Sequence, residues 1–325
     1  MTLAAAPQAA LDSMHVADAT DAPDHALRRV LRSGRVLVGG GILLAVLLVC
    51  LATLPLTLRD GSAWGFDQQH AQMVRMPPAL SPAASWFGHD NLGRSILART
   101  LFGGTISLAV GISAAALSVS LGVIVGLISG YRGGWVDSLL MRSVDVLYGL
   151  PYILLVILLK IAFEQPLTTL FRYPQVANFL VLVFAIGSVS WLTMARVVRG
   201  QVLSLRSQPF IEACKAAGLP EWRIFTRHLL PNLVGPITVY ATLIIPSAIL
   251  NESFLSFLGI GINPPVPTWG SLASEGLLPA LNPNNPRWWM LAFPCVLLAV
   301  TLLSLNFMGD GLRDVFDPKR DAAKI

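Results

Sequence analysis

The sequence predicts an all-α, polytopic membrane protein with six transmembrane helices. Of its 325 residues, 54% are hydrophobic and only 13% are charged, and the mean hydropathy is +0.65. A soluble domain usually carries about 25% charged residues. The apolar residues gather in stretches of about 20, the length with which an α-helix crosses a hydrocarbon core of roughly 30 Å. These observations favour membrane spans over the buried helices of a large soluble protein.

The expected spans divide the chain into a short anchor and a longer core. They cover residues 36–57, 104–128, 138–162, 176–195, 233–258 and 290–308. Residues 1–35 form an N-terminal tail, whose first part is rich in Ala and Asp and is expected to be disordered. The tail contains no apolar segment of a cleaved signal peptide, so we expect residues 36–57 to remain as a membrane anchor. Residues 58–103 form a long outer loop, residues 104–309 the core domain, and residues 310–325 a C-terminal tail.

The basic residues predict that both ends of the chain lie in the cytoplasm. Six spans place most of them on one face, whereas an odd number would divide them between two. On the favoured face lie Arg28, Arg29, Arg32, Arg35, Arg132, Arg196, Arg199, Arg206, Lys215, Arg223, Arg227, Arg313, Lys319, Arg320 and Lys324. The positive-inside rule assigns this face to the cytoplasm. The net charge of +5 therefore reflects membrane topology and does not indicate nucleic-acid binding.

The inner loop at residues 207–232 contains the signals of a short helix. Ser207 is a suitable N-cap and Pro209 suits the first turn, where its missing N–H costs nothing. Gly218 can adopt the left-handed conformation that ends a helix, and Pro220 prevents continuation. The sequence therefore predicts a helix of two to three turns in this loop.

One face of the expected helix is apolar and built mostly from small side chains. It consists of Phe210, Ala213, Cys214 and Ala217. Their spacing of i, i+3, i+4 and i+7 defines one stripe. Glu212 lies off the stripe, near the positive end of the helix dipole. The stripe allows another surface to approach closely, but a helix packed on its own bundle explains the pattern equally well.

The loop also resembles a known sequence family. Glu212-Ala213-Cys214-x-x-x-Gly218, followed by His228-Leu229-Leu230-Pro231-Asn232, is similar to the EAA loop of ABC importer permeases, with Cys214 at a position where alanine is usual. Further segments resemble the same family in the expected order. They are GHDNLGRS at 88–95, GYRGGWVD at 130–137, ESFLSFLG at 252–259, PPVPTWG at 264–270 and NFMGDGLRD at 306–314. The first carries His89 where threonine is usual.

The form of these segments resembles the C-type permease of dipeptide, oligopeptide and nickel importers, and residues 190–201 are most similar to the oligopeptide members. The resemblance implies a type I ABC importer permease fold and peptide cargo, with oligopeptides favoured over dipeptides. It also implies four kinds of partner: a second, B-type permease, two cytoplasmic ATP-binding subunits, an extracytoplasmic peptide-binding protein and the membrane lipid. The bacterial cytoplasmic membrane is the implied location.

The resemblance further implies that residues 210–218 form a coupling helix seated on an ATPase subunit. No lysine in the chain follows a glycine, so a Gly-Lys-[Ser/Thr] phosphate-binding loop is absent from the sequence. We therefore expect a transport subunit that is not an enzyme and holds no cofactor, with ATP and Mg²⁺ bound by the partner subunits. The scattered histidines and cysteines indicate neither a metal site nor a disulfide framework.

Two groups of residues outside the loop are candidate functional sites. Asp90 is expected to cap an outer amphipathic helix that carries Arg94 and Arg99. This helix is interpreted either as a gate that meets the binding protein or as an interfacial helix with snorkelling arginines. Trp269 is a further candidate for the outer contact, although an interfacial anchor is the more common role for tryptophan.

Ionisable residues near the ends of the spans are the second group. Arg142 and Asp145 are three residues apart and are expected either to pair with each other or to line the pathway. Glu252 has the same two interpretations.

Other classes of protein remain as alternatives. Within the family these are permeases for nickel chelates or antimicrobial peptides. Outside it they are a self-sufficient secondary transporter or channel, which would need several polar pathway residues in its spans, and a membrane receptor or scaffold.

Overall fold

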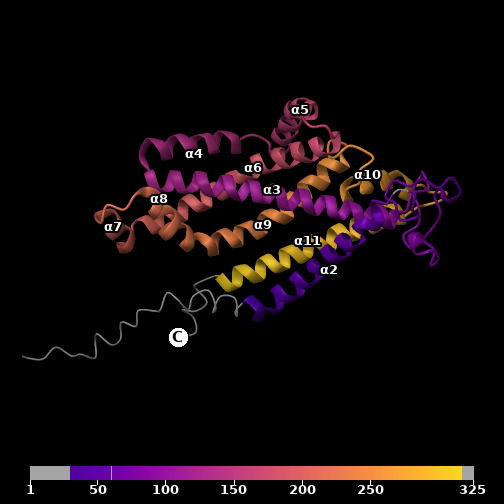
Figure 1. Cartoon of the computed structure of the whole chain (residues 1–325), viewed down its shortest axis with the longest axis horizontal. Helices are drawn as coiled ribbons and strands as arrows, with labels where there is room; N and C mark the ends of the chain where they lie inside the picture. Colours follow the sequence, from indigo (N-terminus) through magenta and orange to yellow (C-terminus); the bar gives the residue numbers. More distant parts are fainter. Residues whose placement is uncertain (1–29, 60, 317–325) are drawn as a thin grey trace, which may run out of the picture.

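The computed structural model describes residues 30–59 and 61–316, and the long elements in this part of the chain are all helices (Figure 1). Six of them are long and apolar enough to span a membrane, as predicted. They are α2 (Gly34–Thr57), α3 (Ile96–Arg132), α5 (Tyr152–Leu170), α6 (Pro174–Arg206), α9 (Leu230–Phe257) and α11 (Trp289–Phe316). The N-terminal residues expected to be disordered and the end of the C-terminal tail lie outside the described residues.

Shorter helices connect the spans. They are the 3₁₀ turns η2 (Ala71–Met73) and η3 (Ala83–Ser85), the α-helices α4 (Gly134–Tyr148), α7 (Pro209–Ala216), α8 (Glu221–Ile224) and α10 (Trp269–Ala280), and the π-helical turn η4 (Phe225–Leu229). Together, α8 and η4 extend α9 into one apolar element over residues 221–257.

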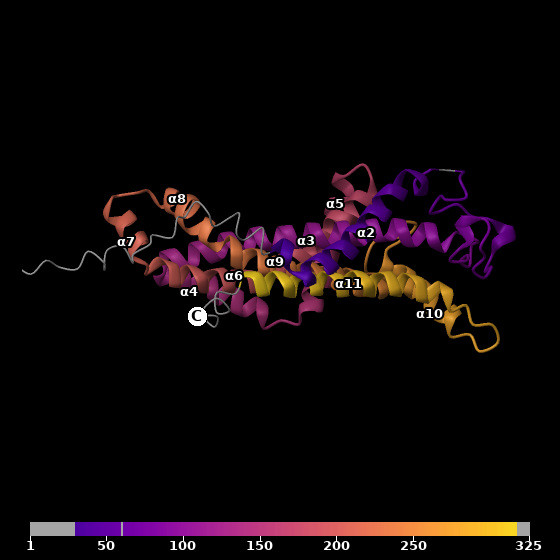
Figure 2. The same cartoon turned by 90° about the horizontal axis from the view of Figure 1, so that it is seen from below.

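The helices form an elongated bundle with two different ends (Figure 2). We call the end that carries α7 and α8 the α7 end. The opposite end, with residues 61–95 and α10, is called the α10 end. Helix α3 has 37 residues, or about 55 Å of length, so it extends beyond a hydrocarbon core of roughly 30 Å and contributes to both ends.

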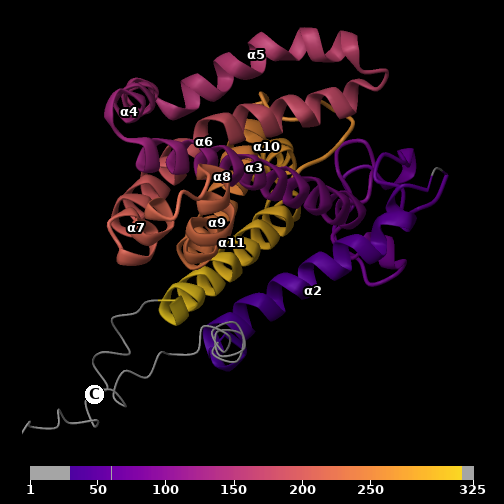
Figure 3. The same ribbon diagram turned by 60° about the vertical axis from the view of Figure 1, so that its left-hand side comes forward.

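The third span differs from the one predicted at residues 138–162. Two helices, α4 and α5, occupy this region, and they run in clearly different directions (Figure 3). The helix breaks at residues 149–151 because Pro151 lacks an N–H and disfavours helical geometry at the residue before it. Only α5 is apolar enough to count as a span. Helix α4 carries Asp137, Arg142 and Asp145 and packs beside α3 and α6.

Glycines bring α3 and α6 into close contact. Gly122, Gly126 and Gly130 recur at every fourth position of α3 and face α6. A Cβ atom on Gly126 would lie 2.7 Å from the carbonyl oxygen of Ala195. Such spacing of small residues lets two membrane helices approach backbone to backbone. Helices α3 and α6 are therefore the central pair of the bundle.

Helix α2 packs mainly against α11, away from α5 and at the edge of the bundle (Figures 1 and 3). Gly39 allows this contact, because a Cβ atom there would lie 2.6 Å from the carbonyl oxygen of Ser304. An ion pair of 2.8 Å joins Arg35 to Asp314. The described start of α2 and the described end of α11 therefore lie together, toward the α7 end.

Candidate functional site

Helix α7 lies at one tip of the elongated bundle (Figures 1 and 2). It begins after Gln208, with Pro209 in its first turn as expected. The predicted N-cap, Ser207, does not cap it, because the Ser207 hydroxyl donates to the carbonyl oxygen of Ser204 instead. Ser207 is therefore the C-cap of α6, and α7 starts one residue later than its sequence signal indicates.

The end of α7 has the predicted left-handed glycine. Gly218 has a φ of +71°. The N–H of Gly218 donates to the carbonyl oxygen of Lys215 at 3.0 Å, and the N–H of Leu219 donates to the carbonyl oxygen of Cys214 at 3.1 Å. These two bonds form a Schellman motif, which satisfies the last carbonyl groups of the helix. No neighbouring atom lies within 4 Å of a Cβ placed on Gly218, so only its backbone conformation calls for glycine.

The two faces of α7 have different surroundings. Ile211 is fully buried, and Cys214 and Leu219 pack with it against a cluster that includes Ile224 and Leu229. The sequence stripe did not include Ile211, and it assigned Cys214 to the same face as Phe210.

The opposite face of α7 is open. Phe210 is 40% exposed, and Ala213 and Ala217 are exposed beside it, as is Glu212. Both sequence interpretations therefore describe a real part of the helix, which packs on its own bundle and also presents a free face of small and apolar side chains.

Polar contacts attach the loop around α7 to the end of α3. Arg206 donates to the carbonyl oxygens of Gly130 and Tyr131 at 3.1 and 3.2 Å. Arg132 forms a 3.1 Å ion pair with Glu221 of α8. These contacts join α3, the end of α6 and the loop that carries α7.

Helix α4 is held to α6 by two ion pairs. Arg199 donates both of its hydrogen bonds to Asp137 at 2.6 Å, and Ser129 also donates to this carboxylate. Bonding from Arg199 holds the pKa of Asp137 below its ordinary value, although partial burial opposes this effect. The second pair joins Arg196 to Asp145 at 2.7 Å. The expected pairing of Arg142 with Asp145 is wrong, because the Asp145 carboxylate points to α6 and Arg142 is exposed.

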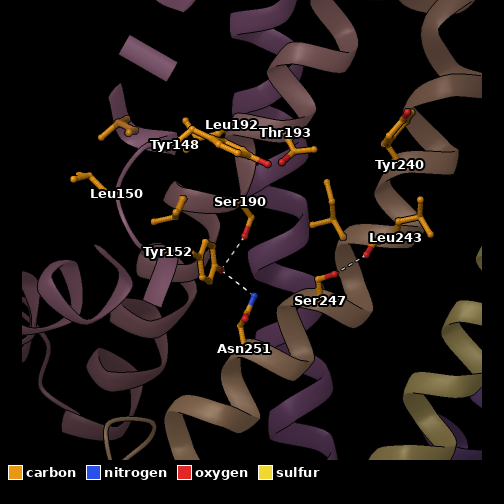
Figure 4. Close-up of a pocket in the computed structure, with 13 residues that line it drawn as sticks. Tyr148, Leu150, Tyr152, Ser190, Leu192, Thr193, Tyr240, Leu243, Ser247 and Asn251 are labelled. Carbon is orange, nitrogen blue, oxygen red and sulfur yellow. Dashed lines mark hydrogen bonds between the residues drawn. The ribbon is translucent and has the colours of Figure 1, made fainter. Parts of the chain in front are cut away.

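A cavity of about 550 Å³ lies between the α4–α5 junction, α6 and α9 (Figure 4). All of its 13 lining residues are uncharged at neutral pH. They are Leu147, Tyr148, Leu150, Tyr152, Val189, Ser190, Leu192, Thr193, Tyr240, Leu243, Ile244, Ser247 and Asn251. We call this cavity the central pocket. None of its residues was a candidate from the sequence, although Asn251, an amide inside an apolar span, was a signal that could have indicated it.

Two hydrogen bonds link three side chains that line the central pocket. Asn251 of α9 donates to the Tyr152 hydroxyl of α5 at 3.0 Å, and that hydroxyl lies 3.2 Å from the hydroxyl of Ser190 in α6 (Figure 4). At one edge the guanidinium of Arg196 lies 4.1 Å from the ring centroid of Tyr148. Since Arg196 also pairs with Asp145, the Tyr148 ring is held at the rim of the pocket by a cation–π contact.

At the α10 end, Asp90 is the centre of a buried cluster of charges. It pairs with Arg94 at 2.7 Å and with Arg99 at 2.8 Å. Arg99 also reaches Glu275 of α10 at 3.0 Å. Burial disfavours the charged form of Asp90, but Arg99 and Arg94 outweigh that effect and lower its pKa. The cluster joins the start of α3 to α10.

Two expectations for this end are wrong. Asp90 does not cap the helix, because Ser95 accepts from the N–H of Ala98 as the N-cap and Asp90 accepts from two N–H groups of the preceding loop. The snorkelling interpretation is also wrong, since the Arg99 side chain is only 2% exposed and that of Arg94 only 10%.

Trp269 and Glu252 lie inside the protein. Trp269 is fully buried and donates from its indole nitrogen to the carbonyl oxygen of Thr100 at 3.0 Å. It is therefore not an anchor in the membrane interface. Glu252 is also fully buried and accepts from the Ser256 hydroxyl at 2.7 Å. Glu252 is not among the residues that line the central pocket.

Within residues 30–59 and 61–316, no group of three or more His, Cys, Asp and Glu side chains could hold a metal ion. The residues described there thus offer an uncharged pocket between helices, an open helix face at one end and a charge cluster at the other. These features define a helical membrane protein with an uncharged pocket between its helices.

Comparison with known proteins assigns the chain to a family. Residues 122–322 match the model of the family described as "Binding-protein-dependent transport system inner membrane component". The chain belongs to this family, and it is a multi-pass protein of the inner membrane that acts as a transport subunit.

Three curated relatives cover most of the chain. The dipeptide transport system permease protein DppC of Bacillus subtilis (strain 168) is 44% identical over 241 residues, which are 74% of this chain and 71% of the relative. The oligopeptide transport system permease protein OppC of Haemophilus influenzae is 40% identical over 294 residues, 90% of this chain and 88% of the relative. The OppC protein of Escherichia coli (strain K12) is 41% identical over 274 residues, 84% and 85% of the two chains.

The fold also occurs in a solved structure. A chain of the MetNI methionine ABC transporter, in an inward-facing conformation, matches with a TM-score of 0.52 at 18% identity and covers 68% of this chain and 97% of its own length. This similarity shows the predicted ABC importer permease fold.

Proposed function

We propose that this chain is the C-type permease of an ATP-driven importer that moves peptides across the cytoplasmic membrane. The names of the relatives support peptides as the cargo, since they include both dipeptide and oligopeptide transport systems. The C-type assignment agrees with the names of these relatives, DppC and OppC, which match 74%, 90% and 84% of the chain. Nickel chelates and antimicrobial peptides remain the alternative cargo within the family.

The observation that carries the coupling part of the proposal is the open face of α7. This face consists of Phe210, Ala213 and Ala217 and is presented on a helix whose other face is anchored by Ile211. A helix with one anchored and one free apolar face can seat in a groove of a partner and still move its own bundle. We assign the partner as one of two cytoplasmic ATPase subunits, which would bind ATP and Mg²⁺.

The motion has a physical route to the spans. Ile211 packs in the same cluster as residues of α6, η4 and α9, and Arg206 bonds to the end of α3. A push on α7 therefore reaches the helices that line the central pocket. Closure of the ATPase pair would supply that push and change which side of the membrane the pocket faces.

The orientation follows from the same assignment. The α7 end carries Arg132, Arg206 and Arg223 and would lie in the cytoplasm, in agreement with the positive-inside rule. Both termini would then be cytoplasmic. The α10 end, with Asp90 and Arg94 in its charge cluster, would face the extracytoplasmic peptide-binding protein, and a B-type permease would complete the pathway.

Crosslinking tests the docking of α7 in the complete transporter. In a chain freed of its own cysteines, Ala213→Cys should crosslink to an ATPase subunit. Ala116→Cys, which is exposed on α3 within a span, should not. Absence of a crosslink from position 213 in an intact, active assembly would overturn the coupling role.

A pair of glycine substitutions tests the transmission of motion. Gly218→Val should reduce peptide uptake and peptide-stimulated ATP hydrolysis together, because its φ of +71° is unfavourable for a β-branched residue. Gly200→Val is the matched control, since Gly200 also has open space around it but no positive φ. Peptide uptake by the chain alone, driven by an ion gradient without ATPase subunits, would support a secondary transporter instead.

A further inference from the structure

The central pocket is a site to which neither the α7 helix nor the α10-end cluster gives a role. We propose that it holds the peptide in transit and that it binds the peptide main chain rather than the charged groups of the cargo. This inference rests on the proposed peptide transport. The volume of the central pocket, about 550 Å³, lies in the range of about 300 to 1,000 Å³ that is usual for ligand pockets.

The polar atoms of the pocket suit peptide groups. They belong to the hydroxyls of Tyr148, Tyr152, Ser190, Thr193, Tyr240 and Ser247 and to the amide of Asn251. Hydroxyl and carboxamide groups both donate and accept hydrogen bonds. Each peptide unit offers one donor and one acceptor that must be satisfied away from water. The rest of the lining is aliphatic and can receive apolar side chains.

The absence of charge from the lining determines what the pocket can distinguish. A carboxylate or ammonium side chain would select cargo of the opposite charge, because electrostatic interactions are less screened in a pocket between helices than in bulk water. The 13 lining residues contain neither. The pocket can therefore accept peptides whatever the charge of their side chains, which leaves selection to the external protein.

Hydrogen bonds between helices hold part of the polar lining in place. Tyr152 bonds to both Ser190 and Asn251, so three helices fix the positions of these groups. Figure 4 shows the Tyr152 hydroxyl and the Asn251 amide pointing toward each other. Groups that are fixed in advance lose little freedom when a ligand binds.

The rim of the pocket can respond to helix movement. Tyr148 lies under the Arg196 guanidinium at the end of α4, directly before the break at residues 149–151. Arg196 belongs to α6, whose far end leads into α7. A shift of α6 relative to α4 would therefore move Tyr148 at the rim, which connects opening of the pocket to the helix that meets the ATPase.

Charge introduced into the pocket tests the inference. Asn251→Asp places a carboxylate there with little change in shape, and Asn285→Asp, in the exposed loop after α10, is the control outside the pocket. Uptake of equally long acidic and basic peptides is measured with the complete transporter in proteoliposomes. Asn251→Asp should raise the ratio of basic to acidic uptake about tenfold or more, which corresponds to about 1.4 kcal/mol. An unchanged ratio in an active Asn251→Asp transporter would overturn the inference.

A second experiment does not depend on Asn251→Asp folding. Ser247→Cys and Ser120→Cys are matched, since both serines are exposed on a span and bond to the carbonyl oxygen four residues earlier, but only Ser247 lines the pocket. A peptide with a thiol-reactive side chain should label position 247 during ATP-driven turnover and should leave position 120 unlabelled. Equal labelling, or none at 247 while transport continues, contradicts the inference. Failure of the proposed function is distinct, because the unmodified transporter would then import no peptide.

Discussion

Arg199 and Asp137 form a two-point ion pair between α6 and α4, with both hydrogen bonds at 2.6 Å. The two parallel hydrogen bonds fix the orientation of the guanidinium, and the opposite charges add to the attraction. Gly126 and its neighbours already bring α3 against α6. Helices α3, α4 and α6 are thus tied together at the level where the loop that carries α7 begins.

Replacing Asp137 by Asn should destabilise this junction. The substitution removes the charge-assisted bonds and leaves the Arg199 guanidinium, which is one-third exposed, without its carboxylate. We expect a loss of about 1.5 to 3 kcal/mol. The melting temperature (Tm) of the purified chain in detergent measures it. Asp145→Asn is the control, because the Asp145–Arg196 pair is more exposed and should contribute about 1 kcal/mol or less.

The pH dependence of the Asp137 contribution has a definite sign. Bonding from Arg199 lowers the pKa of Asp137, so the folded value lies below the unfolded value of about 3.9. The contribution is then present above that pH and is lost as the pH falls through the folded pKa. The difference in Tm between the parent chain and Asp137→Asn should stay constant from pH 8 to pH 5. A difference that disappears in this range would contradict the ion pair.

Gly126→Leu should prevent the close contact of α3 with α6. A Cβ atom alone would lie 2.7 Å from a carbonyl oxygen of Ala195, so the backbones would have to separate. We expect a destabilisation of at least about 3 kcal/mol, at or above the usual cost of overpacking. Gly41→Leu, on the open side of α2, should leave Tm nearly unchanged. Equal Tm values for the two variants would show that the helices do not meet at this glycine.

Arg99→Met should loosen α10 from α3. The methionine keeps much of the buried volume but leaves Glu275 without its bonds to Arg99 and leaves Asp90 with Arg94 alone. Breaking a buried ion pair costs about 3 to 5 kcal/mol, and the lower end is expected because Asp90 keeps one partner. Proteolysis at residues 281–288 should become faster. The exposed Arg59 provides the control variant Arg59→Met, for which cleavage should not change.

His89 should make the stability of the chain depend on pH. Burial and the neighbouring His70 lower the pKa of His89, with partial opposition from Asp90. The unfolded chain therefore binds more protons just below pH 6.5, and stability should decrease as the pH falls through that value. His89→Thr should make the curve of Tm against pH flatter between pH 7.5 and 5. An identical curve would mean that other groups cause the dependence.

Local features of the sequence predicted much of the fold correctly. Stretches of apolar residues determine where helices can cross a membrane, because each span satisfies its own backbone hydrogen bonds. The stop at Gly218 is equally local, since its φ and the two bonds of its motif involve residues within five positions. The break between α4 and α5 could have been predicted in the same way from Pro151. Because apolar residues continue on both sides of Pro151, the sequence predicted one span there instead.

Tertiary structure decided which residues meet. Asp145 pairs with Arg196 instead of Arg142. Tyr152 forms a hydrogen bond with Asn251, which lies 99 residues later in the sequence. Ile211, which the predicted stripe omitted, anchors α7 together with Cys214. A helix pattern shows which side chains share a face, but burial of that face depends on the neighbouring helix. The six spans were thus determined by composition along the chain, whereas the central pocket exists only because the four helices α4, α5, α6 and α9 pack around it.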